Sequence, residues 1–291
     1  MIENYLWEEL ATFAEQKTLA KTAEALHVTQ PSITRGMQKL EDELGVILFD
    51  RQPNRITLTE TGELAAREAQ KILSLNREVI AKISNFYQSK EVISVAFSIP
   101  GPRILLHYLE PQLATNIQIE DSLQHGNLAT LLTQREYTLI LSNQELFTKE
   151  IESRFIGVEH LSVNLNQFMY QASQSSLTFS DLNGLSFLVL SDIGIWKKIV
   201  QENIQDTKFL YQQQEETFSE ISKYSDFPYF STNISKLNPQ FDQRDTTDNN
   251  RVSIPIQDRA AKMEIYANYL KSQKKTVTPL LEVIGKNWPQ P

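Results

Sequence analysis

The feature that most constrains the fold is a run of three short amphipathic segments within residues 6–45. In each segment, apolar side chains recur about every three or four residues, which is the periodicity of a helix with one buried face. A turn of about three residues, 27–29, separates the second segment from the third. Two helices joined in this way predict a helix-turn-helix. The expected inner positions are Leu6, Leu10, Phe13, Ala14, Leu19, Ala23, Leu26, Ile33, Met37, Leu40 and Leu44.

The ends of these helices carry residues that are suited to capping. Thr18 and Thr29 precede the second and third helices, where a hydroxyl can accept a hydrogen bond from a free backbone N–H. Pro31 falls in the first turn of the third helix, where the missing N–H costs nothing. Gly45 follows the last apolar residue and is expected to end the helix as its C-cap.

The face of the third helix opposite its apolar stripe carries hydrogen-bond donors and one small apolar side chain. Side chains of these types read base edges and phosphates in the major groove of DNA. The acidic residues 41–43 come only at the far end, which suits a helix that enters the groove by its N-terminal end. The candidates on this face are Pro31, Ser32, Thr34, Arg35, Gln38 and Lys39.

A β-hairpin is predicted after the third helix. The apolar segments 46–49 and 56–58 flank residues 50–55, and Pro53–Asn54 is typical of a turn. Arg51 and Arg55 lie near the tip, so the hairpin would form a wing that touches the DNA backbone.

The charge of the chain argues against a broad DNA-binding surface. The net charge of the 291 residues is −8, and the first sixty residues hold six Lys or Arg against ten Asp or Glu. Because phosphate contacts need concentrated positive charge, DNA binding would depend on a few well-placed cations. On this pattern alone, a three-helix bundle with a solvated polar face remains an alternative.

Three runs of residues, 28–35, 40–51 and 58–62, closely resemble the signature of LysR-type transcriptional regulators. The first reads VTQPSITR, the second LEDELGVILFDR and the third LTETG, and the similarity is continuous over residues 6–86. The resemblance implies a winged helix-turn-helix, and Thr29 at the start of its third helix is also a candidate DNA-binding residue. The resemblance places Gln30, Pro31, Ser32, Thr34 and Arg35 in the major groove and Arg51 on the phosphate backbone.

Gly36 departs from the family, in which this position is usually polar. Glycine inside a helix costs roughly 1 kcal/mol relative to alanine. The departure is also expected to remove one contact with DNA.

A long helix is predicted from its cap at Thr59 to about Tyr87. Apolar residues recur there every seven residues, which makes a seam for a partner helix. Glu68 and Lys82 interrupt the line, so packing of the helix on its own chain remains the alternative. The resemblance favours a homodimer or homotetramer, and two-fold pairing implies a roughly palindromic operator in double-stranded DNA. The candidate dimerisation residues are Ala65, Ile72, Leu75, Val79, Ile83 and Phe86.

Strand and helix patterns alternate from residue 91 onward. Such alternation predicts a parallel sheet with right-handed crossovers, in two successive units of which the second begins near Leu161. Residues 100–102, Pro-Gly-Pro, are expected to separate the first strand from its helix, and Thr278 is expected to cap the last helix. The chain is expected to return to the first unit near 263–270. The predicted strands are 92–97, 117–119, 138–141, 187–190 and 209–211, and the predicted helices are 104–113, 126–134, 195–204, 217–224 and 278–288.

The predicted fold class is α+β and multidomain. Residues 1–60 form the winged helix-turn-helix domain, 61–88 the linker helix and 91–291 an effector-binding domain. Two α/β lobes joined by two crossings resemble a periplasmic-binding-protein fold, which the family resemblance also implies. The first lobe covers about 91–160 and 262–291, and the second about 161–261.

A small-molecule effector is expected between the two lobes. Strand ends and helix N-termini meet there, and their backbone N–H groups suit an anion. Each candidate could equally cap a helix or line a loop. The polar stretch 242–251 is predicted to be an exposed loop. The candidate effector-binding residues are Ser98, Ile99, Pro100, Ser142, Asn143, Ser191, Asp192 and Thr232.

Catalysis, cofactors and metals have no positive signal. The chain has no cysteine, its four histidines (His27, His107, His125 and His160) have no metal-ligand spacing, and there is no G-x-S-x-G, P-loop or G-x-G-x-x-G. The acidic N-terminus and the lack of any run of about 18 apolar residues predict a cytoplasmic protein without a membrane partner. A solute-binding transport protein, an α/β enzyme and a DNA-binding protein with an effector-independent oligomerisation domain are the rival classes.

Overall fold

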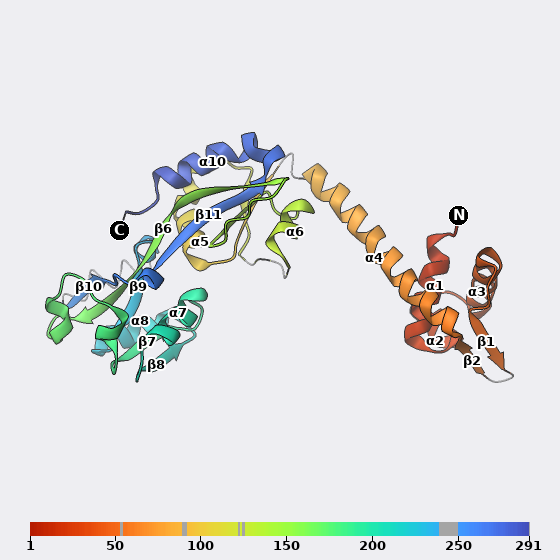
Figure 1. Cartoon of the computed structure of the whole chain (residues 1–291), viewed down its shortest axis with the longest axis horizontal. Helices are drawn as coiled ribbons and strands as arrows, with labels where there is room; N and C mark the ends of the chain where they lie inside the picture. Colours follow the sequence, from red (N-terminus) through yellow and green to blue (C-terminus); the bar gives the residue numbers. More distant parts are fainter. Residues whose placement is uncertain (53–54, 89–91, 122, 124–125, 239–249, 291) are drawn as a thin grey trace. The chain divides into compact units, whose positions relative to one another are not determined.

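The computed structural model describes residues 1–52, 55–88, 92–121, 123, 126–238 and 250–290 (Figure 1). They form two compact units, the N-terminal unit Met1–Ser84 and the C-terminal unit Asn85–Pro291. Within the described residues, no helix is long and apolar enough to cross a membrane.

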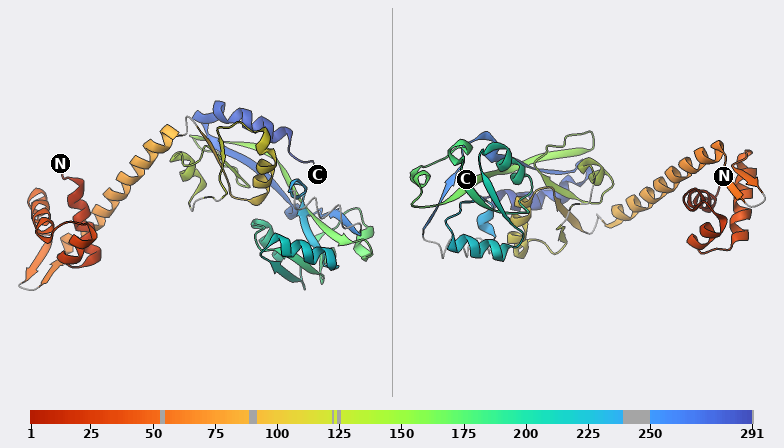
Figure 2. Two further views of the ribbon diagram at one scale, coloured as in Figure 1. Left: turned by 180° about the vertical axis from the view of Figure 1, so that it is seen from behind. Right: turned by 90° about the horizontal axis from the view of Figure 1, so that it is seen from below.

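The N-terminal unit is built from α1 (Asn4–Gln16), α2 (Leu19–Ala25), α3 (Gln30–Leu44) and the first turns of α4 (Glu60–Gln88). These helices surround one apolar cluster (Figure 2). The inner positions predicted from the periodicity are confirmed as members of the cluster or as packed against it. The cluster also holds Leu48, Phe49, Ala66 and Ala69, so the hairpin and α4 close the same core.

The predicted caps of these helices are confirmed. The Thr18 hydroxyl accepts a hydrogen bond from Lys21 N (3.3 Å), and the Thr29 hydroxyl accepts one from Ser32 N (3.4 Å). Thr59 caps α4 by accepting a hydrogen bond from Gly62 N at 3.0 Å. Gly45 ends α3 in the left-handed region (φ 68°), as glycine at a C-cap does readily.

The hairpin lies three residues later than its predicted first strand. It consists of β1 (Phe49–Gln52) and β2 (Arg55–Leu58), which are antiparallel. The prediction of a strand at 46–49 is wrong because Ile47 is 72% exposed and Val46 is also exposed. The predicted turn at Pro53–Asn54 lies outside the described residues.

The C-terminal unit is organised around a mixed sheet with the strand order β4-β3-β5-β11-β6-β9-β7-β8, and β10 pairs with β6. The predicted parallel pairing is confirmed for β3 with β4 and β5, and β7 is parallel to β8. The strands are β3 (Ile93–Phe97), β4 (Ile117–Ile119), β5 (Leu139–Ser142), β6 (Ile151–Asn166), β7 (Ser186–Leu190), β8 (Lys208–Gln212), β9 (Tyr229–Thr232), β10 (Arg251–Pro255) and β11 (Lys262–Leu270). Of the predicted polar loop, 242–249 lie outside the described residues and Arg251 begins β10.

The long strand β6 changes partner along its length. Its residues 151–160 pair with β11, whereas its residues 161–166 pair with β9 and β10. The helices of the unit are α5 (Pro100–Leu109), α6 (Leu128–Thr133), α7 (Ile195–Asn203), α8 (Glu215–Tyr224) and α10 (Lys274–Lys286), of which α10 packs across β6 and β11 (Figures 1 and 2).

Two predicted helix starts are wrong by four residues. Helix α5 begins at Pro100, because the first-turn N–H groups of a helix have no internal partner and proline is tolerated there. Helix α10 begins at Lys274, so Thr278 lies inside it and donates a hydrogen bond to Lys274 O (2.7 Å) instead of capping it. Val277 is the first buried residue of α10. Its burial in the core stabilises the helical turn that precedes Pro279.

Candidate DNA-binding surface and ligand cavity

The outward face of α3 exposes most of the side chains that the sequence predicts to contact DNA. Arg35 and Gln38 are exposed, and neither side chain makes a hydrogen bond or ion pair within the described residues. Thr34 is half-buried, and its hydroxyl donates a hydrogen bond to Gln30 O at 3.1 Å. The other exposed candidates are Thr29, Gln30, Pro31, Ser32 and Lys39.

Lys39 is held by α1 although it lies on the exposed face. Its ammonium forms an ion pair with Glu3 and donates a hydrogen bond to the Tyr5 hydroxyl at 3.3 Å. The Glu3 carboxylate, and then Tyr5, raise the pKa of Lys39 above its ordinary value. Lys39 is therefore a positive charge that is already partly neutralised.

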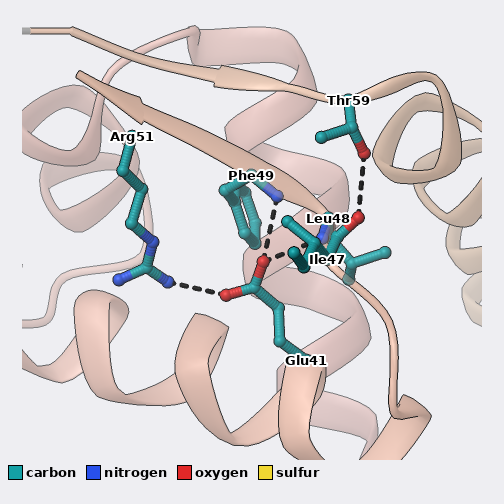
Figure 3. A network of polar contacts seen from close by, with 6 residues as sticks. All are labelled: Glu41, Ile47, Leu48, Phe49, Arg51 and Thr59. Atoms are coloured by element: carbon teal, nitrogen blue, oxygen red, sulfur yellow. Dashed lines mark hydrogen bonds and ion pairs between the residues drawn. The ribbon is translucent and has the colours of Figure 1, made fainter.

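Glu41 fastens the hairpin to α3 (Figure 3). One carboxylate oxygen accepts hydrogen bonds from Leu48 N (2.8 Å) and Phe49 N (3.0 Å), and the other pairs with the Arg51 guanidinium at 2.8 Å. Thr59 completes the network by donating to Ile47 O at 3.0 Å. Glu41 thus occupies the backbone N–H groups at the start of β1 and fixes Arg51 beside α3.

A groove of about 500 Å³ runs between α2, α3 and the hairpin. Lys17, Arg51 and Arg55 line it together with Gln30 and Thr34. Lys17 and Arg55 have no ion pair within the described residues, whereas Arg51 shares its charge with Glu41, so the groove concentrates positive charge mainly through Lys17 and Arg55. Lys17 was not predicted as a DNA-binding residue. Its positive charge directly before the N-cap residue Thr18 could have indicated a phosphate contact.

Gly36 is explained by the packing of α1 rather than by DNA. It is buried, and a Cβ at this position would lie 1.8 Å from Glu9 Oε2. The expectation that glycine removes a DNA contact here is therefore wrong. Glu9 is 8% exposed, and its Oε2 has no hydrogen-bond partner among the described residues. Burial raises the pKa of Glu9 to about 7.

The linker helix α4 carries an exposed apolar stripe. Ile72, Leu75, Val79 and Ile83 are 38–66% exposed, which is high for aliphatic side chains on one face of a helix. Phe86 is 46% exposed, and the Arg135 guanidinium lies 4.8 Å from its ring centroid. Ala65 differs from these candidates, because it is half-buried against the N-terminal cluster.

A cavity of about 460 Å³ lies in the C-terminal unit. Three predicted effector-binding residues line it, namely Pro100 at the start of α5, Asp192 after β7 and Thr232 at the end of β9. Most of the wall is apolar, including Leu161, Leu188, Ile193, Phe218 and Phe230.

The other five effector-binding candidates do not line this cavity. Ser98 is exposed, Ile99 is buried in the core, and Asn143 and Ser191 are half-buried. Ser142 is fully buried, where its hydroxyl accepts a hydrogen bond from Asn268 Nδ2 (2.9 Å) and donates one to Gln144 O (2.9 Å). Its polar atoms are thus engaged within the protein.

The cavity wall contains a buried acid that was not predicted. Glu159 of β6 is 2% exposed, and its Oε2 has no hydrogen-bond partner among the described residues. Burial raises the pKa of Glu159 to about 7, although hydrogen bonding by Thr232 and Trp196 opposes the rise. Alternate residues of β6 from Gly157 to Val163 are buried in the structure, but a glutamate between glycine and leucine at these positions gave no local sequence signal for a cavity.

A sequence family described as "Bacterial regulatory helix-turn-helix protein, lysR family" matches residues 7–63. Residues 7–63 therefore carry the helix-turn-helix domain that this family model describes. The match covers α1, α2, α3, the hairpin and the start of α4, which is the region that carries the outward donors and the groove.

Two LysR-type relatives are each named "Hydrogen peroxide-inducible genes activator". The protein of Dickeya chrysanthemi is 30% identical over 200 residues, which cover 64% of this chain and 62% of the relative. The protein of Haemophilus influenzae is 31% identical over 194 residues, covering 64% of this chain and 63% of the relative. This chain therefore spans less than two thirds of the length of either relative.

Similarity of fold to a solved structure extends over nearly the whole chain. The crystal structure of Vibrio fischeri DarR in complex with DNA is 18% identical and covers 97% of this chain and 98% of its own, with a TM-score of 0.58. The predicted fold class, α+β with an N-terminal helix-turn-helix and a C-terminal α/β domain, is confirmed.

Proposed function

We propose that this chain is a transcription regulator that binds double-stranded DNA through its winged helix-turn-helix and responds to a small-molecule effector. The observation that carries the proposal is the exposed face of α3, on which Arg35 and Gln38 have no partner within the described residues. Such a regulator works on DNA in the cytoplasm, and the proposal includes no catalytic activity.

Two kinds of DNA contact follow from the positions of the side chains. The outward residues of α3, led by Arg35 and Gln38, read base edges in the major groove. Lys17, Arg51 and Arg55 line the neighbouring groove and contact phosphates, which fix position without carrying sequence information. This division explains how a chain with a net charge of −8 binds DNA, since the cations needed are few and local.

Pairing of two copies follows from the stripe on α4. Ile72, Leu75, Val79, Ile83 and Phe86 form the seam in a homodimer or in each pair of a homotetramer. A two-fold axis between paired α4 helices presents two copies of α3 to a roughly palindromic operator.

The effector site is the cavity of the C-terminal unit. We divide the unit into lobes of residues 91–160 with 262–291, and of residues 161–261, because β6 changes partner near residue 160. Side chains from both sets line the cavity, so ligand binding changes how the lobes close. The proposal includes no thiol chemistry at this site, since the 291 residues contain no cysteine.

A gel-shift titration of the full chain on the DNA upstream of its own gene tests the proposal. We expect a discrete complex at nanomolar protein that survives an excess of scrambled DNA of the same length. If the same fragment and its scrambled version bind equally, or neither binds, the regulator proposal is wrong, and a solute-binding protein or an enzyme becomes the better reading.

A further inference from the structure

The charged groups around the cavity are mainly acidic. Its lining includes four carboxyl groups and two basic side chains. The two bases, Arg103 and His107, are both directed to one exposed residue, since Arg103 donates to Asp121 O (3.3 Å) and His107 lies 3.1 Å from Asp121 Oδ1. Of the four carboxyl groups, Asp121 and Asp192 belong to exposed residues and Glu215 is half-buried, so Glu159 is the buried acid of the lining.

One carboxylate oxygen of Glu159 lacks a hydrogen-bond donor within the described residues. This atom, Oε2, is buried without a hydrogen-bond partner in the described part of the chain. A buried carboxylate that lacks a partner costs several kcal/mol in general, so proteins rarely keep one without a use. Glu159 lies in the wall of a cavity, where a bound molecule can supply the missing donor.

The charged groups on the surrounding elements do not neutralise Glu159. Burial, Thr232 and Trp196 account for its pKa, and no charged side chain contributes. The charged and titratable residues on the surrounding elements include Arg103 and His107 of α5, Lys197, Lys198 and Glu202 of α7, Glu215 of α8, Lys236 after β9, Lys262 and Glu264 of β11, Lys274, Lys275, Glu282 and Lys286 of α10, and His160 of β6.

The start of α5 is poorly suited to an anionic ligand. A helix N-terminus attracts anions through its free N–H groups, but Pro100 and Pro102 of the first turn have none. Gly101 lies between them, and a Cβ there would lie 2.4 Å from Glu159 Oε2. The carboxyl of Glu159 thus already occupies the place at which the carboxylate of a ligand would meet the helix.

We propose that the cavity binds a small organic cation, an amine or amidine with an apolar body, whose N–H groups donate to Glu159. The apolar wall holds the body, and its volume of about 460 Å³ lies within the usual range for small-molecule sites. This inference rests on the proposed function, because it assigns the ligand class of the same cavity.

Isothermal titration of the full chain with matched probes tests the ligand class. The pairs are 2-phenylethylamine with phenylacetate and hexylamine with hexanoate, which share the apolar body and differ in the sign of the charge. We expect each amine to bind at least 10-fold more tightly than its acid. In Glu159→Gln, which keeps the shape of the side chain, this preference should disappear, whereas the exposed Glu216→Gln should behave as the wild type.

The pH dependence of binding adds a second readout. The pKa of Glu159 is raised to about 7, so a cation must displace a proton at lower pH and meets a carboxylate at higher pH. Amine binding should strengthen by several-fold between pH 6 and pH 8 in the wild type and stay constant in Glu159→Gln.

Three results would overturn the inference: acids that bind as tightly as their amines, amine binding that is unchanged in Glu159→Gln, or no amine binding at millimolar concentration. The comparison of amine with acid in the wild type stands even if the variant does not fold. The gel-shift assay on DNA is independent of these probes. Sequence-specific DNA binding without any amine preference therefore rejects the ligand class alone, and loss of both rejects the regulator proposal.

Discussion

At the scale of single residues, the buried acid Glu9 governs how the N-terminal unit responds to pH. Its pKa is raised to about 7 in the folded chain, compared with 4.5 for a solvated glutamate. The folded state therefore binds more protons than the unfolded state between these values, and stability is lost as the pH rises through 7.

We expect Glu9→Gln to remove this loss. Relative to the wild type, the variant should gain on the order of 1–2 kcal/mol of unfolding free energy at pH 8 and little at pH 4.5. Urea unfolding at the two pH values measures the difference, and Glu8→Gln, an exposed neighbour on the same helix, is the control. A gain that is equal at both pH values would contradict the assignment.

Gly36 and Glu9 should be energetically coupled, because their atoms compete for one space. In the wild type, the methyl group of Gly36→Ala must displace the Glu9 carboxyl, whereas in a Glu9→Ala background it enters free space. We therefore expect Gly36→Ala to be more favourable in that background by roughly 0.5–3 kcal/mol. A double-mutant cycle by urea unfolding measures the coupling, and additive effects would show that the two residues do not meet.

At the scale of elements, α4 carries the clearest structural prediction. Ile83→Asp places a charge in the exposed apolar stripe and should raise the dimer dissociation constant roughly 100-fold or more. Ala81→Asp puts the same charge on the opposite side of the helix and should leave assembly unchanged. Sedimentation velocity on both variants measures the dimer dissociation constant. If the two variants dissociate to the same extent, the apolar stripe is not the dimer interface.

The elements also show what a sequence pattern can and cannot predict. The apolar spacing of α3 and its capping residues, Thr29 and Gly45, fixed its bounds, because helix periodicity and caps are local signals. The start of β1 could not be predicted, because the Glu41 carboxylate takes up Leu48 N and Phe49 N, which the local sequence does not reveal. Apolar residues 46–47 therefore looked like a strand and are not one.

At the scale of the whole molecule, the two units differed in how far the sequence could predict their sites. The outward residues of α3 all lie within one helix, so the helical periodicity of residues 30–39 was enough to predict them. The cavity gathers Gly101, Glu159, Trp196 and Thr232 from segments far apart in the sequence. Pro100 and Asp192 were predicted because they follow predicted strands, whereas Glu159 required the topology that brings β6 next to the start of α5.

The measurement that tests the central claim most directly compares Arg35→Ala with Arg51→Ala on the operator and on operators with single base-pair changes, across a range of salt. Arg35→Ala should lose about 1–3 kcal/mol of affinity and tolerate change at one base pair. Arg51→Ala should weaken binding to all sequences alike and reduce the salt slope by about one. Equal losses that are independent of sequence in both variants would contradict a base-reading α3.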